Sequence, residues 1–107
     1  MQRGEIWWAE LPKPAGRRPV VLVSRTEAYQ VRDLVTVARV TTRVRNVPTE
    51  VPLGPDSGLP QFCVVNVDIL STIRQKDLSA RIAVLPPNKQ KALDDALRFA
   101  LGLGNVT

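Results

Sequence analysis

The stretch Gly16-Arg17-Arg18-Pro19-Val20-Val21-Leu22-Val23-Ser24 decides the fold of this chain. Its aliphatic block, Val20–Val23, predicts a buried strand, because a continuous run of branched apolar residues fills both faces of a sheet. Pro19 fits at the first position of that strand, since it has no N–H to donate to a ladder. Arg18 is therefore expected at the mouth of a rigid core element, with an extended backbone imposed by the following proline.

Arg18 has two interpretations at this level. A cation held at the start of a stiff strand can serve as an anion-binding group, because a guanidinium matches the geometry of carboxylate and phosphate oxygens. The other interpretation is an ordinary loop arginine that precedes a core strand. The local pattern alone favours this second, simpler interpretation.

The positive charge is concentrated in the N-terminal part of the chain. The 107 residues carry 15 Lys+Arg against 10 Asp+Glu, which gives a net charge of +5. Residues 1–45 hold nine basic and four acidic side chains and so account for the whole excess. Eight of those nine basic residues are arginine, which favours a polyanionic partner such as nucleic acid. A generically basic surface is the alternative.

The residue types that the sequence lacks or rarely uses exclude several kinds of catalytic and metal-binding site. The sequence has no histidine, which excludes a Ser-His-Asp triad and any histidine-based metal or acid–base site. Its one cysteine, Cys63, lies in an apolar run and is interpreted as a core residue of a protein in a reducing compartment. No apolar run has membrane-spanning length, and the N-terminus lacks a signal-peptide pattern, so we expect a soluble, cytoplasmic protein.

Hydrophobic periodicity predicts one mainly β (α+β) domain over residues 1–107. Alternation over residues 5–11 predicts a first strand that sends Trp7 and Trp8 to opposite faces, one inward and one outward. A helical turn over Glu27-Ala28-Tyr29 is expected, with Ser24 or Thr26 as its cap. Further strands are expected over 34–41, 49–53 (at a sheet edge), 62–70 continuing to 74 after a bulge, and 81–85, with a turn at 76–80.

One helix is expected after Pro86-Pro87. Five apolar residues on one face predict it, and Gly102 marks its end. This face comprises Leu93, Ala96, Leu97, Ala100 and Leu101. The elements together predict a small curled antiparallel sheet or barrel covered by the helix. The helix and an exposed sheet edge also offer surfaces for a homodimer.

RNA cleavage is the enzymatic chemistry that suits this set of residues. RNA carries its own nucleophile, the 2′-OH, which can attack the adjacent phosphorus without a metal ion. A protein then has to align the attack in line and stabilise the negative charge that develops on the phosphate. A fixed arginine suits that charge, and a threonine hydroxyl can position the reacting group.

The chain resembles the MazF/PemK family of toxin endoribonucleases over nearly its full length. The residues that carry the resemblance are Arg3-Gly4-Glu5-Ile6-Trp7-Trp8, the opening stretch Gly16–Ser24, the strand ending Val40-Thr41-Thr42, the segment Pro48-Thr49-Glu50-Val51 and the C-terminal amphipathic helix. The resemblance implies an SH3-like barrel, a homodimer and a sequence-selective cut in single-stranded RNA. It also implies metal- and cofactor-independent chemistry that leaves a 2′,3′-cyclic phosphate and a 5′-OH.

The resemblance also places the catalytic roles. It assigns them to Arg18, the arginine before the proline, and to Thr41, with Thr42 as the alternative if the strand register slips by one residue. The loop before Arg18 is short here, so the family's loop contacts do not transfer. Candidate RNA-binding residues are Lys13, Arg17, Thr42, Arg43 and Arg45. The implied protein partner is a small antitoxin with an acidic or extended C-terminal segment.

Two non-enzymatic functions compete with this prediction. One is a toxin on the same fold that binds and inhibits DNA gyrase, which would need no Arg18. The other is a plain RNA-binding module, which would show salt-sensitive binding without turnover. The Arg18 and Thr41 pair favours the enzyme over both.

Overall fold

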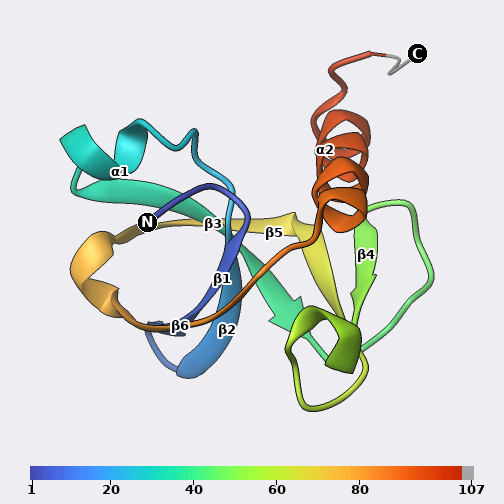
Figure 1. Cartoon of the computed structure of the whole chain (residues 1–107), viewed down its shortest axis with the longest axis horizontal. Coiled ribbons are helices and arrows are strands. Elements are labelled where there is room, and N and C mark those ends of the chain that lie inside the picture. The colour runs from blue at the N-terminus through green and yellow to red at the C-terminus, as the bar shows by residue number, and fades with distance from the viewer. Residues whose placement is uncertain (105–107) are drawn as a thin grey trace.

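The fold of the computed structural model, which describes residues 1–104, is an antiparallel sheet that curls into a half-barrel under a C-terminal helix (Figure 1). The six strands lie in the order β4-β5-β3-β2-β1-β6. This arrangement confirms the predicted SH3-like small barrel with a covering helix. The elements are β1 (Glu5–Glu10), β2 (Arg17–Leu22), α1 (Ala28–Val31), β3 (Leu34–Thr41), β4 (Glu50–Leu53), η1 (Pro55–Ser57), β5 (Cys63–Arg74), η2 (Gln75–Asp77), β6 (Leu78–Val84) and α2 (Pro87–Leu101).

The curled sheet buries both of its faces, which explains why the second half of β2, Val20–Leu22, is apolar throughout. Val21 packs into the core beneath α2, beside Ile6 and Leu93. Val20 and Leu22 point the other way, into a second core on the opposite face. These three side chains are fully buried, as predicted, but Val23, the last residue of the predicted strand, lies beyond β2 and is half-buried.

Pro19 lies inside β2 rather than at its first position. It pairs with Trp8 of β1, and β2 itself begins two residues earlier at Arg17. The prediction of a strand start at Pro19 is therefore wrong on the β1 side. The prediction does fit the pairing of β2 with β3, because that pairing begins only at Val20, directly after Pro19. A proline is tolerated where no neighbouring strand needs its N–H.

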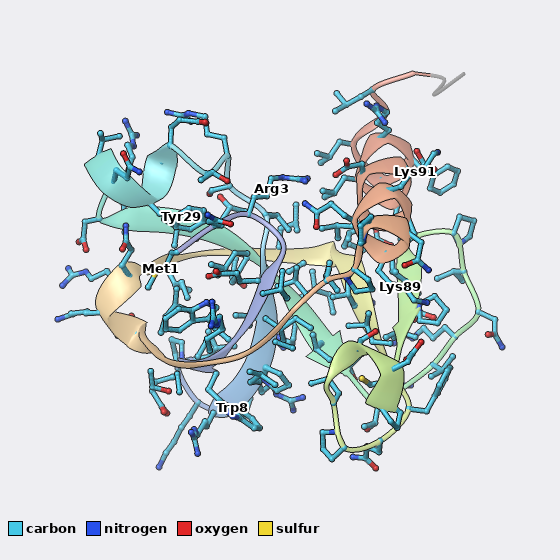
Figure 2. All side chains as sticks on the ribbon, viewed as in Figure 1. Met1, Arg3, Trp8, Tyr29, Lys89 and Lys91 are labelled. Atoms are coloured by element: carbon cyan, nitrogen blue, oxygen red, sulfur yellow. The ribbon has the colours of Figure 1, made fainter. Side chains whose placement is uncertain are left out.

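The two tryptophans do not divide into one buried and one exposed side chain. They do point to opposite faces, with Trp7 packed on the second core and Trp8 beside Pro19. Both are half-buried, because the curl of the sheet covers each face. Figure 2 shows Trp8 at the bottom of the view, on the side of the molecule away from α2.

The predicted bulge is present in β5, earlier than expected. Ala38 of β3 pairs with Leu70, and the next residue, Arg39, pairs with Asn66. Residues 67–69 are therefore extra on the β5 side. The bulge bends β5 away from β3 where the two strands pass the region described below, as bulges commonly do beside functional sites.

Two local predictions were wrong. β6 begins at Leu78, so the expected turn over 76–80 is shortened to η2. Neither Ser24 nor Thr26 caps α1, because the Ser24 hydroxyl accepts from the Thr36 N–H at 2.8 Å and the Thr26 hydroxyl from the Arg3 N–H at 3.2 Å.

The covering helix α2 forms as predicted and ends at Gly102, which adopts a left-handed backbone with φ 67°. Leu93 and Ala96 are buried against β4 and β5. Leu101 is 55% exposed, which contradicts its predicted place in the core. The last turn projects beyond the sheet, as Figure 1 shows, so that Ala100 still packs on the core whereas Leu101 lies outside it. No helix within residues 1–104 is long and apolar enough to cross a membrane.

Candidate active site

Arg18 lies near the start of β2 and is fixed by its own loop. Its Nε donates a hydrogen bond to the carbonyl oxygen of Ala15 at 3.0 Å. The loop is closed by the N–H of Leu11, which donates to the carbonyl of Gly16 at 2.9 Å, with Gly16 at a φ of 67°. The bond to Ala15 uses one donor of the guanidinium and leaves its terminal N–H groups available for a ligand.

The register of the sheet brings Arg18 and Thr41 to the same place. Val20 of β2 pairs with Arg39 of β3. Continuing this antiparallel register by two residues sets Arg18 opposite Thr41, on the same face. The Thr41 Oγ1 accepts a hydrogen bond from the backbone N–H of Arg43 at 3.1 Å. This bond orients the hydroxyl and leaves its proton free to donate.

Two cavities contain both residues. The first, here called the basic cavity, has a volume of about 180 Å³. Its lining holds four arginines and no carboxylate: Arg18, Arg39, Thr41, Arg43, Arg45, Asn66 and Ile69. Positive charge without a compensating acid raises the affinity for an anion such as a phosphate.

The second shared cavity, here called the apolar cavity, has a volume of about 220 Å³. Trp8, Leu59 and Ile82 contribute apolar surface to it, beside Arg18 and both threonines. An apolar cavity with an aromatic wall suits a nucleobase, which stacks without regard to sequence. Cys63 also lines it, but burial raises the pKa of this thiol, so it remains protonated and fits the predicted core role.

A third cavity, the loop cavity, lies between the loop after β1 and strand β5 and has a volume of about 590 Å³. Arg18 and Arg39 line it as well, so the two arginines stand where the loop and basic cavities meet. Lys13, Ser71 and Thr72 add one more cation and two hydroxyls. Its lining also contains no carboxylate.

The structure places four of the five predicted RNA-binding residues in the linings of these cavities. Lys13 lines the loop cavity, Thr42 the apolar cavity, and Arg43 and Arg45 the basic cavity. Arg17 is engaged differently, because its guanidinium stacks 4.7 Å from the centroid of Trp8 and its Nε lies 3.4 Å from a carboxylate oxygen of Glu10. It therefore stiffens the Trp8 wall of the apolar cavity.

Arg39 and Asn66 are site residues that the sequence analysis missed. They pair with each other across β3 and β5 and both line the basic cavity. The signal for Arg39 was a lone charge in an otherwise apolar strand, two residues before Thr41 and hence on its face. Asn66 gave no such signal, because only the bulge in β5 brings it opposite Arg39.

A divalent metal ion would find few ligands here. Within residues 1–104, no group of three or more His, Cys, Asp and Glu side chains is arranged to hold one. The chemistry available to the site is electrostatic and positional. It offers several arginines, of which Arg18 is held by its bond to Ala15, and an oriented hydroxyl at the shared cavities.

Comparison with known proteins identifies relatives over nearly the whole chain. The family described as "PemK-like, MazF-like toxin of type II toxin-antitoxin system" matches residues 2–101. The "Probable endoribonuclease MazF5" of Mycobacterium tuberculosis is 36% identical over 100 residues, which cover 92% of this chain and 91% of that protein. The "Endoribonuclease MazF6" of the same species is 34% identical over 112 residues, covering 96% and 98%.

Solved structures agree with these relatives. The "Mycobacterium tuberculosis toxin MazF-mt6" superposes with a TM-score of 0.87 at 36% identity, over 94% of this chain and 99% of that one. A mycobacterial "Endoribonuclease in complex with its cognate antitoxin" gives a TM-score of 0.87 at 27% identity, over 99% of both chains.

Proposed function

Because the chain belongs to the PemK-like, MazF-like toxin family of type II toxin–antitoxin systems, we propose that it cuts single-stranded RNA at Arg18 and Thr41. It is an endoribonuclease toxin, and its relatives named as endoribonucleases favour this enzyme over a gyrase-binding toxin or a passive RNA-binding module. The observation that carries the catalytic assignment is the sharing of two cavities by Arg18 and Thr41.

The proposed reaction is an internal transesterification. The 2′-oxygen attacks the adjacent phosphorus while the bond from phosphorus to the 5′-oxygen breaks, in line. The products are a 2′,3′-cyclic phosphate and a 5′-OH, and the proton lost by the 2′-hydroxyl is balanced by the one that the 5′-oxygen gains. The reaction needs no external oxidant, reductant or nucleophile.

Arg18 is proposed to stabilise the charge of the transition state. The non-bridging phosphate oxygens gain negative charge as the 2′-oxygen attacks, and a pre-positioned cation stabilises this charge more than that of the ground state. The hydrogen bond to Ala15 holds the guanidinium before substrate arrives, which lowers the cost of reorganisation. An arginine stays protonated in proteins, so the role proposed for Arg18 is electrostatic.

Thr41 is proposed to orient the reacting ribose and phosphate. The N–H of Arg43 occupies one lone pair of its Oγ1, so the hydroxyl proton points elsewhere and can donate to a phosphoryl oxygen. Thr42 lines only the apolar cavity and does not share the basic cavity with Arg18. This difference supports Thr41 rather than Thr42 as the active hydroxyl.

The test of the proposed reaction is an analysis of RNA ends. Purified protein is incubated with a mixed-sequence single-stranded RNA, with and without EDTA, and the new 5′ and 3′ ends are identified. We expect EDTA-resistant cleavage that leaves 5′-OH and cyclic phosphate ends. Strict dependence on added metal, or 5′-phosphate ends, would contradict the mechanism.

The proposed protein partners are a cognate antitoxin and a second copy of the chain. The carboxylate-free basic cavity gives an acidic antitoxin segment an electrostatic reason to cover the RNA site. The open sheet edge at β4 leaves a surface for self-association. Inhibition of cleavage on titration with the antitoxin tests the first proposal, and sedimentation equilibrium tests the second.

A further inference from the structure

Arg39 lines the candidate site, and the proposed reaction gives it no role. It is half-buried in β3, between the buried residues Ala38 and Val40. Its Nε is buried and has no hydrogen-bond acceptor among the described residues 1–104. A buried guanidinium donor without an acceptor is unfavourable, because it loses its hydration and gains nothing in exchange.

The surroundings of Arg39 indicate what would satisfy it. It lines both the loop cavity and the basic cavity, and neither cavity has a carboxylate in its lining. We therefore expect a ligand to supply the acceptor for the Arg39 Nε, and this ligand should be negatively charged. Arg39 pairs with Val20, which follows Arg18 by two residues on the same face of β2. Arg39 therefore lies on the same face of the sheet as Arg18, further from the start of β2.

We propose that Arg39 binds a second phosphate of the RNA, the one next to the scissile phosphate. This inference rests on the proposed function, because it takes Arg18 and Thr41 as the place of cleavage. The RNA backbone then passes from the basic cavity into the loop cavity. Lys13 and the hydroxyls of Ser71 and Thr72 line the space beyond Arg39. Two adjacent phosphates held by two arginines fix the ribose between them for in-line attack.

The test measures binding separately from turnover. The sequence that the wild-type protein cleaves is first read from a mixed RNA pool, and that RNA is then made with 2′-O-methyl groups throughout, so that it binds without reacting. Arg39→Gln is compared with Arg25→Gln, which makes the same charge change at an exposed residue beyond the other end of β2. Arg39→Lys, which retains the charge, monitors folding and is expected to restore part of the affinity.

We expect Arg39→Gln to weaken RNA binding about tenfold, the effect of losing one charge-assisted hydrogen bond. The slope of log K against log salt should fall by about 0.7, as for one lost phosphate contact on a single strand. Arg25→Gln should leave the slope unchanged. Equal affinity and equal slope for the two variants would overturn the inference.

A neutral linkage in the RNA identifies the phosphate. Methylphosphonate is placed at one linkage at a time on either side of the cleavage position. At the phosphate that Arg39 binds, the neutral linkage should weaken wild-type binding and add no further loss in Arg39→Gln. Additive losses at every linkage would overturn the assignment. Wild-type protein that binds the unmodified RNA of the mixed pool but never cleaves it would overturn the proposed function instead, and the two failures are therefore distinguishable.

Discussion

Different backbone groups hold the side chains of Arg18 and Thr41 in place at the cavities that the two residues share. The loop carbonyl of Ala15 fixes the guanidinium, and the N–H of Arg43 fixes the hydroxyl. Both contacts are local, so each side chain is oriented before RNA binds. Preorganisation of this kind makes a single donor worth a large rate factor, because the site does not reorganise during the reaction.

At the residue scale, substitution of the adjacent Thr41 and Thr42, one at a time, tests which hydroxyl takes part in the reaction. We predict that Thr41→Val lowers kcat about 100-fold, the typical effect of removing one preorganised donor. Thr42→Val removes the same hydroxyl one position along and should retain most of kcat, since Thr42 does not line the basic cavity. Single-turnover cleavage of one RNA by the two variants provides the measurement. A larger loss in Thr42→Val would move the active hydroxyl to that residue.

The sequence predicted the catalytic candidates better than their surroundings. Arg18 and Thr41 lie at strand ends and carry the family resemblance, so they were found without a structure. Arg39 lies in the middle of an apolar strand, where its burial and its unpaired Nε depend on contacts with β2 and β5. Such contacts are set by the register of non-local strands, which local periodicity does not fix.

At the element scale, strand interiors were predictable and their connections were less so. β3 was predicted over residues 34–41 and forms over the same residues, because it is bounded by polar residues. β6 was predicted to begin at Arg81 and begins at Leu78. Ser79 and Ala80, just before Arg81, are polar or small, and Leu78 alone makes no strand pattern. These residues form a strand because they pair with β1, where Ala9 is the partner of Leu78.

Glu5 of β1 contacts Arg81 of β6, and its carboxylate makes the stability of the fold depend on pH. Its buried carboxylate accepts from the Trp7 indole N–H at 2.9 Å and lies 3.4 Å from Arg81 of β6. Burial acts to raise the pKa of Glu5, but the hydrogen bonds from Trp7, the backbone of Gln2 and Arg81, together with the charge of the N-terminus, outweigh it. The pKa of Glu5 therefore lies below its ordinary value of 4.5.

A lowered pKa in the folded state means that the ionised carboxylate stabilises the fold above the ordinary pKa. We predict that Glu5→Gln lowers the unfolding temperature at pH 7. The difference from wild type should shrink as the pH falls below 4.5 and Glu5 becomes protonated. Thermal unfolding followed by circular dichroism across this range measures it, with the exposed Glu27→Gln as the control. A difference that stays constant with pH would contradict the role given to the carboxylate.

At the scale of the whole molecule, the fold separates its supporting side from its reactive side. α2 packs on β4 and β5 and closes the core that contains Ile6 and Leu93. The three cavities gather instead around the start of β2, the end of β3 and the bulged part of β5. Four arginines of the excess in residues 1–45 line a single cavity without an acid among them, which supports the proposed RNA site.

The most direct test of the account compares wild-type protein with Arg18→Ala in RNA cleavage and in RNA binding. Cleavage is measured under single-turnover conditions, and binding is measured on the same sequence with 2′-O-methyl groups. The account predicts that Arg18→Ala slows cleavage at least about 100-fold while weakening binding far less, because Arg18 acts mainly on the transition state. Cleavage by Arg18→Ala at a rate comparable to that of the wild type would contradict it.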